Sequence, residues 1–342
     1  MTTPPARRPV VGRVDFSNPT HSVYAALAAI LVSGSILVAL QGGVYLDSAG
    51  VLSILSDSTA LGLVAIGQTI VILCRSLDLS VALLIGLCSL VAAEIMDGRT
   101  SMVVPAIVAT LAVAALVGLA NGLIITKLRV NAFIATLGMA LILRGLLEAR
   151  YTGPAGDTPL SFQQVGYTRI GPIPVSALIV LALAAATWWY LTQSRAGYHV
   201  YAVGGSPEIA RLSGVRTDRT IISAHVLCSL AAGITGLYFA ARLDSGSPFV
   251  GTDGAYDLQS IAAVVLGGTL LAGGRGGIVG TIGGVLILAS LDTLFDDLGV
   301  NPFFKDVVRG VVIIVAVAIY ARRAVDPRRR VERSPAEAGA AP

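Results

Sequence analysis

Long apolar runs separated by short polar breaks dominate the chain between residues 23 and 320. A helix that crosses a bilayer needs about 20 mostly apolar residues, and about ten runs approach that length. The runs are Val23–Leu40, Leu52–Leu73, Leu79–Ile95, Met102–Ile125, Ala132–Ala149, Ile173–Leu191, Ile221–Ala241, Leu258–Leu271, Ile278–Leu294 and Phe303–Tyr320. This pattern predicts an all-α polytopic membrane protein.

The eighth run, Leu258–Leu271, is short and ends among glycines. It predicts a broken or half-spanning helix, which a membrane tolerates only against protein or a water-filled cavity. Two similar stretches, Asp78–Ser80 and Asp257–Ser260, each open an apolar run. Because transporters are often built from repeats, these matches hint at a weak internal repeat.

Composition points to the same protein class. Hydrophobic residues make up 55% of the chain and charged residues 13%, against about 25% charged residues in soluble domains. Such a chain has too little polar surface to cover itself in water. The three cysteines lie in apolar stretches without CxxC spacing, so we expect buried, inert thiols at Cys74, Cys88 and Cys228.

Basic residues set the expected orientation. With the N-terminus in the cytoplasm and ten alternating helices, 17 of the 24 Lys and Arg residues fall on the cytoplasmic side. We therefore expect both termini to be cytoplasmic, with tails at residues 1–20 and 323–342 around a transmembrane domain at 21–322. The net charge of +4 follows from this topology, and we expect no nucleic-acid partner.

The longest polar interruption, residues 192–220, falls on the cytoplasmic side. Ser206 is a helix-capping residue, Pro207 suits the first helical position, Glu208 favours the helix N-terminus, and Gly214 ends the helix. Two interpretations stay open: a short helix lying on the membrane surface, or a docking helix that fits a groove on a cytoplasmic partner.

The sequence lacks the motifs of several enzyme classes. The two lysines, Lys127 and Lys305, do not lie in a GxxxxGK[ST] sequence, so the chain has no P-loop for ATP. There is no HExxH motif, and the order of residues suggests no Ser/His/acid set. We interpret His225, near the start of an apolar run, as a structural hydrogen-bonding residue. We predict no catalytic residue, no metal site and no cofactor in this chain.

Polar residues inside apolar runs are costly and are therefore functional candidates. Gln68, Thr69, Asn121 and Thr136 would suit a path for a neutral, polyhydroxylated solute, although such side chains also hold helices together. Arg144 and Glu148 stand four residues apart. They are either an ion pair near the outer interface or a polar wall of the path.

Two further features have mainly structural interpretations. Asp78 precedes a predicted helix, so we interpret it as an N-cap. Small residues recur every fourth position, which predicts close helix packing or a backbone lining for a substrate path. These small residues are Gly118 and Gly122 in one run, and Gly276, Gly280 and Gly284 in another.

Four stretches together resemble the ribose-type permeases of ABC transporters, in that family's order and over roughly residues 25–322. They are residues 68–81, the Asn-Ala-Phe-Ile-Ala-Thr-Leu-Gly-Met stretch at 131–139 with Arg144-Gly145, the loop at 195–214, and the glycine-rich segment at 266–281. The chain departs from the family at Arg75–Leu77, where Gly-Gly is common, and at Asn131–Ala132, where proline is common.

The resemblance implies a multi-pass protein of the bacterial inner membrane that imports a simple sugar, a pentose or a hexose. It further implies a second permease chain in a homodimer, a periplasmic sugar-binding protein, and a cytoplasmic ABC ATPase that holds the ATP and Mg. The ATPase-coupling loop would comprise Gly197, Gly204, Gly205, Glu208, Ala210, Arg211 and Gly214. Alternatives are a permease for a nucleoside, a branched-chain amino acid or a furanosyl signalling compound, an ATP-independent facilitator, or an intramembrane enzyme.

Overall fold

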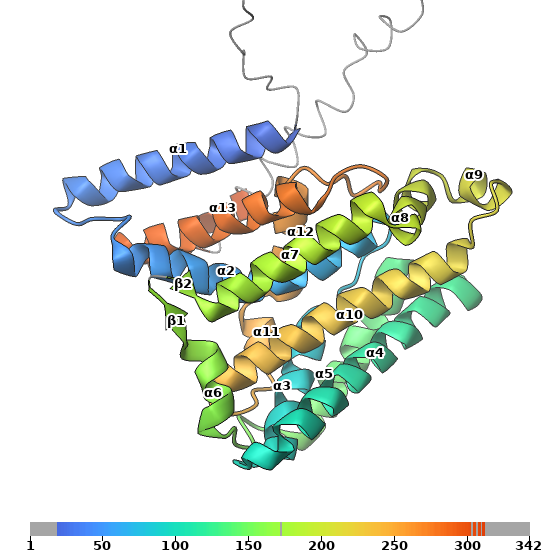
Figure 1. Ribbon diagram of the computed structural model, residues 1–342, viewed down its shortest axis with the longest axis horizontal. Coiled ribbons are helices and arrows are strands. Elements are labelled where there is room, and N and C mark those ends of the chain that lie inside the picture. The colour runs from blue at the N-terminus through green and yellow to red at the C-terminus, as the bar shows by residue number, and fades with distance from the viewer. Residues whose placement is uncertain (1–18, 172, 302–303, 306, 309, 312–342) are drawn as a thin grey trace, which may run out of the picture.

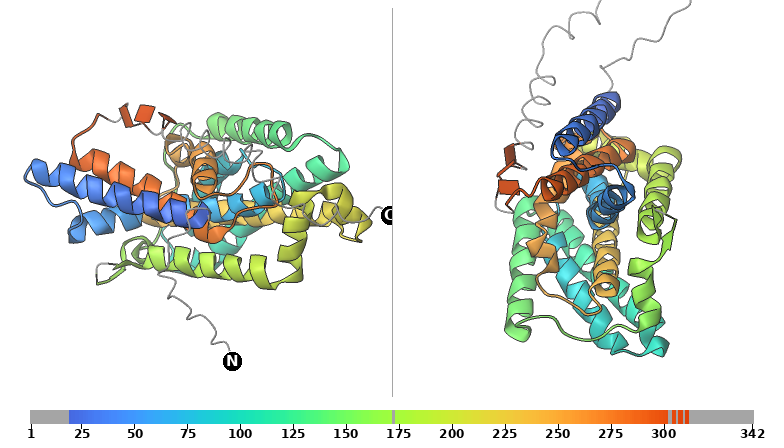
Figure 2. Two further views of the ribbon diagram at one scale, coloured as in Figure 1. Left: turned by 90° about the horizontal axis from the view of Figure 1, so that it is seen from above. Right: turned by 90° about the vertical axis from the view of Figure 1, so that its left-hand side faces the viewer.

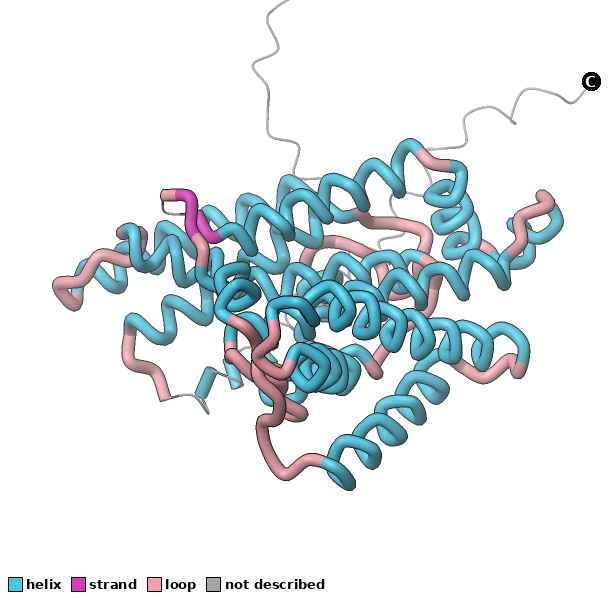
Figure 3. Tube along the Cα trace, turned by 60° about the horizontal axis from the view of Figure 1, so that its bottom comes forward, coloured by secondary structure: helices cyan, strands magenta, loops and turns pink. Residues whose placement is uncertain are grey.

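The computed structural model describes residues 19–171 and 173–301, together with 304–305, 307–308 and 310–311. Over these residues the protein is a helix bundle in which the axes of the long helices are roughly aligned, some near horizontal and others tilted in Figure 1, and neighbouring helices can be antiparallel. Figure 3 shows that helices account for nearly all regular structure, with one small hairpin. The expected C-terminal tail, and the N-terminal tail apart from its last two residues, lie outside the described residues.

Seven helices are long and apolar enough to cross a membrane. Their ends lie within four residues of the predicted runs, which confirms a polytopic helical membrane fold. These helices are α1 (Pro19–Leu40), α2 (Ser48–Leu73), α4 (Val103–Lys127), α5 (Ala132–Arg150), α7 (Val175–Gln193), α10 (Thr217–Arg242) and α13 (Ile278–Asp297).

Two apolar helices are shorter. Helix α12 (Tyr256–Leu266), which follows the four-residue α11 (Val250–Asp253), has 11 residues, about 17 Å at 1.5 Å per residue, against a hydrocarbon core of about 30 Å. This confirms the predicted broken helix. Helix α3 (Val81–Met96) has 16 residues, slightly fewer than a typical membrane-spanning helix, so a full span there stays a prediction.

The ends of the short helices have a backbone cause. Asp97 adopts a left-handed conformation (φ 45°) and ends α3, while Gly268 (φ 90°) follows the end of α12. An α-helix cannot continue through such a residue. The tenth predicted run lies mostly outside the described residues, so the total of about ten spans stays a prediction.

Helices α2 and α10 form the centre of the bundle and run in opposite directions. Helix α2 packs against α12 and α13, whereas α10 packs against α3 and α4, and each of those pairs also packs together. The same arrangement therefore occurs twice, as two related halves would produce. The central helices meet at Gly67, where an added Cβ would lie 2.8 Å from the Cα of Cys228.

Burial follows this arrangement. Every residue of α2 from Ser58 to Leu73 is buried, as expected for a helix that is apolar on all sides. Helices α5 and α7 lie on opposite flanks of the bundle (Figure 2) and expose large apolar side chains, such as Leu141 and Leu181. The three cysteines are buried and free, as predicted.

Short elements occupy the two ends of the bundle (Figure 1). The end with α8 (Arg195–Gly205) and α9 (Pro207–Leu212) is named the α8 end here. At the opposite end, the α6 end, α6 (Leu160–Tyr167) precedes a hairpin of β1 (Arg169–Ile170) and β2 (Ile173–Pro174). The 3-10 turn η1 (Thr100–Met102) precedes α4. The sequence pattern did not predict α6, α8 or the hairpin, because they are short and glycine-rich or polar.

Candidate functional site: a buried polar cluster and the α8 end

The segment between α2 and α3, residues 74–80, is named the link. Its Asp78 side chain is fully buried, and Oδ1 accepts hydrogen bonds from the Ser80 backbone N–H (3.0 Å) and from the Ser80 hydroxyl (2.6 Å). Ser80, not Asp78, occupies the N-cap position of α3. The N-cap interpretation of Asp78 was therefore wrong: its carboxylate lies two residues earlier and is directed toward α10.

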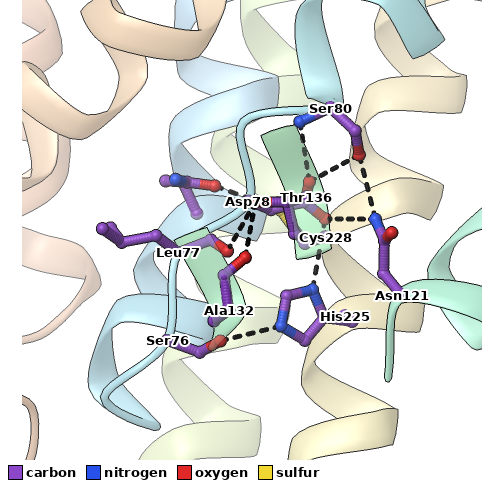
Figure 4. Close-up of polar contacts among 10 residues, drawn as sticks. Ser76, Leu77, Asp78, Ser80, Asn121, Ala132, Thr136, His225 and Cys228 are labelled. Atoms are coloured by element: carbon purple, nitrogen blue, oxygen red, sulfur yellow. Dashed lines mark hydrogen bonds and ion pairs between the residues drawn. The ribbon is translucent and has the colours of Figure 1, made fainter. Parts of the chain in front are cut away.

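His225 of α10 contacts the link with both ring nitrogens (Figure 4). Its Nδ1 lies 3.2 Å from Asp78 Oδ2, and its Nε2 lies 2.9 Å from Ser76 Oγ. Because an ionised carboxylate only accepts hydrogen bonds, Nδ1 donates to Asp78. In the neutral imidazole, Nε2 then accepts from the Ser76 hydroxyl. His225 is thus a hydrogen-bonding residue, as expected, and it is fully buried.

Further polar side chains extend this cluster to three neighbouring helices (Figure 4). Asn121 of α4 donates to Ser80 Oγ (3.0 Å) and, more weakly, to Asp78 Oδ2 (3.5 Å). The Cys228 thiol of α10 donates to Gln68 Oε1 of α2 (3.4 Å), and the Thr136 hydroxyl of α5 lies 3.4 Å from the Leu77 carbonyl oxygen. The link is therefore contacted by side chains from α4, α5 and α10, and the Cys228–Gln68 contact joins α10 to α2.

A buried carboxylate inside an apolar bundle is stable only when its charge is compensated. Asp78 has donors from Ser80, His225 and Asn121, so its charge is well solvated by the protein. Removing a hydrogen-bond donor from a buried carboxylate typically costs about 1–3 kcal/mol or more, because the charge loses part of its compensation. The cluster consequently fixes the position of the link relative to α4 and α10.

The order Ser76–His225–Asp78 has the connectivity of a Ser-His-Asp catalytic triad, which the sequence order did not suggest. Nucleophilic catalysis requires a substrate carbonyl to reach the serine oxygen. Ser76 is only 6% exposed, and Asp78 and His225 are 0% exposed. In this conformation no substrate reaches the set, so the geometry favours a structural role over hydrolysis.

The six residues predicted for a substrate path fall into separate places. Asn121 and Thr136 contact the link (Figure 4), Gln68 accepts a hydrogen bond from Cys228, and the Thr69 hydroxyl lies 2.8 Å from the Thr281 hydroxyl of α13. All four side chains are fully buried. Arg144 and Glu148 instead form an ion pair (Nε to Oε1, 2.7 Å) on the surface of α5, with 62% and 51% of their side chains exposed. A path along any of these residues stays a prediction.

The predicted coupling loop folds into α8 and α9. The Ser206 hydroxyl accepts from the Ile209 N–H (3.3 Å), Pro207 opens α9, and Gly214 is left-handed (φ 82°), as the sequence predicts. Among the other predicted coupling residues, Ala210 is buried, Glu208 and Arg211 are exposed, and Gly197 packs against the backbone of Tyr190 and Leu191. Their role in coupling stays a prediction.

Three backbone segments meet beneath α8, and their contact is named the glycine junction. It comprises Gly204 of α8, Leu73 at the end of α2, and Gly273–Gly274 of the glycine-rich segment. The Gly274 N–H donates to the Leu73 carbonyl (3.0 Å), and a Cβ on Gly204 would lie 1.8 Å from that oxygen. Only glycine fits there, so α8 directly contacts the residue that precedes the link.

The other predicted glycine positions are at helix contacts. Added Cβ atoms on Gly118 and Gly122 would lie 2.7 Å from the backbone of α10, at His225 and Ile222 respectively. Added Cβ atoms on Gly280 and Gly284 would overlap the carbonyl oxygens of Gly267 and Ala263, so only glycine fits at these two positions. Gly276 does not belong to the same helical series as Gly280 and Gly284, although it was predicted with them. It lies in the loop before α13, with φ 128°, and packs against Thr269.

Comparisons with known proteins identify the family. The model of the family described as "Branched-chain amino acid transport system / permease component" matches residues 50–317. The chain is 38% identical to the ribose import permease protein RbsC of Escherichia coli strain K12 over 315 residues, 91% of this chain and 97% of that protein.

Two other relatives agree. RbsC of Bacillus subtilis strain 168 is 36% identical over 83% of this chain and 88% of its own length. The galactose/methyl galactoside import permease protein MglC of Haemophilus influenzae is 30% identical over 87% and 93%. No solved structure matches. The motifs, the helical membrane fold and these relatives together show that the chain belongs to the ribose-type family of ABC transporter permeases, multi-pass proteins of the bacterial inner membrane.

Proposed function

We propose that this chain is the membrane-spanning subunit of an ATP-driven importer that translocates a pentose or hexose delivered by a periplasmic binding protein. The observation that carries this proposal is the nearly full-length similarity to permeases named for ribose and galactose import. The fully buried, uncharged groups Gln68, Thr69 and Asn121 are also suited to a neutral, hydroxylated solute if they become accessible in another conformation.

The α8 end is the cytoplasmic side in this proposal. Arg195, Arg211, Arg216 and Arg219 lie at that end, and cytoplasmic loops of membrane proteins are rich in such residues. The α6 end is then periplasmic and receives the binding protein. The short helices α3 and α12 occupy corresponding places in the two halves, and such pairs often border the solute path of a transporter.

The cytoplasmic ATPase docks on α8 and α9. Tyr198, Ile209 and Leu212 expose 60%, 66% and 89% of their surface at this end of the bundle. Exposed apolar groups outside the lipid are typical of partner surfaces. The alternative, a helix lying on the membrane, would place the same side chains in lipid. Because the chain has no P-loop, the ATPase supplies ATP binding and hydrolysis.

A second copy of the chain covers the exposed face of α5. The Arg144–Glu148 pair begins six residues, or about 9 Å, before the end of α5, where lipid would surround charged groups. Gly138 and Gly145 on the same helix have no described atom within 4 Å of an added Cβ. A homodimer through this face shields the pair from lipid and places it beside the solute path.

The decisive experiment is uptake of labelled ribose, galactose and other simple sugars by a strain that lacks this gene, with and without the restored gene. Uptake of one sugar that requires both this chain and its ATPase supports the proposal. Uptake of a nucleoside, an amino acid or a furanosyl compound instead would identify another ABC substrate. Uptake that persists without the ATPase, or ATP hydrolysis by the purified chain alone, would refute it.

A further inference from the structure

The link lies between two features that the permease function leaves unconnected: the glycine junction beneath α8 and the Asp78–His225 pair. Only four residues separate Leu73, which contacts Gly204, from Asp78, which contacts α10. Within this stretch Arg75 is left-handed (φ 62°) and lies against Gly273. A short, tightly bent segment of this kind cannot absorb much movement through its own length.

The far end of the link is anchored on α10 by directional contacts. His225 bonds to Asp78 and to Ser76 with its two ring nitrogens, so it fixes two positions of the link at once. Its own helix packs along α4 through Gly118 and Gly122. Through these contacts a displacement of the link would move both α10 and α4.

We infer that His225 is a positioning residue that transmits movement of the docked ATPase from α8, through the glycine junction and the link, to α10. This inference rests on the proposed function. Movement of α8 displaces the end of α2 at Leu73. The Asp78–His225 pair then carries that displacement to α10, because a buried pair with compensated charge breaks only at high cost.

The side-chain geometry offers two matched variants. In His225→Asn the amide lies where Nδ1 lies, so it keeps a donor to Asp78 and loses the contact with Ser76. In His225→Gln the amide reaches farther, toward Ser76, and the contact with Asp78 is lost. Ser229→Ala is the control: Ser229 is buried one turn farther along α10, and its hydroxyl has no hydrogen-bond partner among the described residues.

The complete complex of permease, ATPase and binding protein is reconstituted in proteoliposomes, and both solute uptake and ATP hydrolysis are measured. The readout is the number of solute molecules taken up per ATP hydrolysed. We expect His225→Gln to lower this ratio about fivefold or more, the range of a typical coupling energy, while ATP hydrolysis continues. His225→Asn and Ser229→Ala should stay near the wild-type ratio.

Asp78→Asn provides a second variant if His225→Gln does not assemble. It retains an acceptor for Ser80 and removes only the charge, so it should assemble and also lower the ratio. An unchanged ratio in every variant that assembles, or equal proportional losses of uptake and hydrolysis, would overturn the inference. A wild-type complex that takes up no sugar would instead refute the proposed function, so the two failures are distinguishable.

Discussion

The glycine junction makes a sharp prediction about stability. In Gly204→Ala the added Cβ would lie 1.8 Å from the Leu73 carbonyl oxygen and 2.5 Å from the Gly274 nitrogen, whereas real Cβ contacts essentially never fall below 3.0 Å. The backbone of α8 must therefore move away from α2. Overpacking of this kind costs about 1–3 kcal/mol, and loss of the Gly274–Leu73 hydrogen bond adds about 1 kcal/mol. We expect a total loss of about 2–4 kcal/mol.

The neighbouring residue, Gly205, is a matched control, because its replacement by alanine should stabilise the protein instead of destabilising it. A Cβ on Gly205 has no described atom within 4 Å, and Gly205 is the last residue of α8. Alanine restricts the unfolded chain more than glycine does, so Gly205→Ala should stabilise the protein by at most about 0.5–1 kcal/mol. The two variants differ by one position and by no charge.

Thermal unfolding of the purified chain in lipid nanodiscs, followed by near-ultraviolet circular dichroism, measures the effect. We expect the unfolding midpoint of Gly204→Ala to fall clearly below that of the wild type, and that of Gly205→Ala to stay level or rise. A wild-type midpoint for Gly204→Ala, or an equal decrease in both variants, would show that α8 does not approach α2 as closely as the structure describes.

Three further predictions concern the two ends and the flank of the bundle. Ile209→Asp should weaken ATPase binding in a pull-down without changing the unfolding midpoint, since Ile209 is 66% exposed; unchanged binding would favour the membrane-surface interpretation of α9. Gly145→Cys on α5 should form a disulfide-linked dimer in oxidised membranes, whereas Leu181→Cys, which is exposed on α7, should not. The reverse result would show that the homodimer interface does not include α5. Burial raises the pKa of Tyr45, between α1 and α2, to about 12, from about 10 in an unfolded chain. The stability that comes from keeping this phenol neutral is therefore fully present below pH 10 and is lost progressively up to pH 12. Tyr45→Phe should reduce the decrease in unfolding midpoint at alkaline pH. An identical decrease in both proteins would contradict this.

Much of the architecture could be read from local sequence. Apolar runs such as Leu52–Leu73 fix where helices form, because backbone groups in lipid must bond within their own segment. The cap at Ser206 and the stop at Gly214 also depend only on neighbouring residues, so α9 was predicted accurately. The glycine-rich ending of Leu258–Leu271 was enough to predict a broken helix. Glycine readily adopts a positive φ, as Gly268 does here, and an α-helix ends at such a residue.

Other features depend on which segments meet, and periodicity carries no such information. Asp78 and His225 are 147 positions apart, and nothing near Asp78 distinguishes a helix cap from one half of a buried pair. Likewise, Gln68 and Asn121 have the residue types of a solute path, yet tertiary packing buries them in one polar cluster. The sequence by itself determined the membrane class, the helices and the family motifs, because these follow from local hydrophobicity and local backbone preference. Tertiary structure decided that the motifs at Gly204, Leu73 and Gly274 touch, because only the packed bundle brings segments distant in sequence within van der Waals distance.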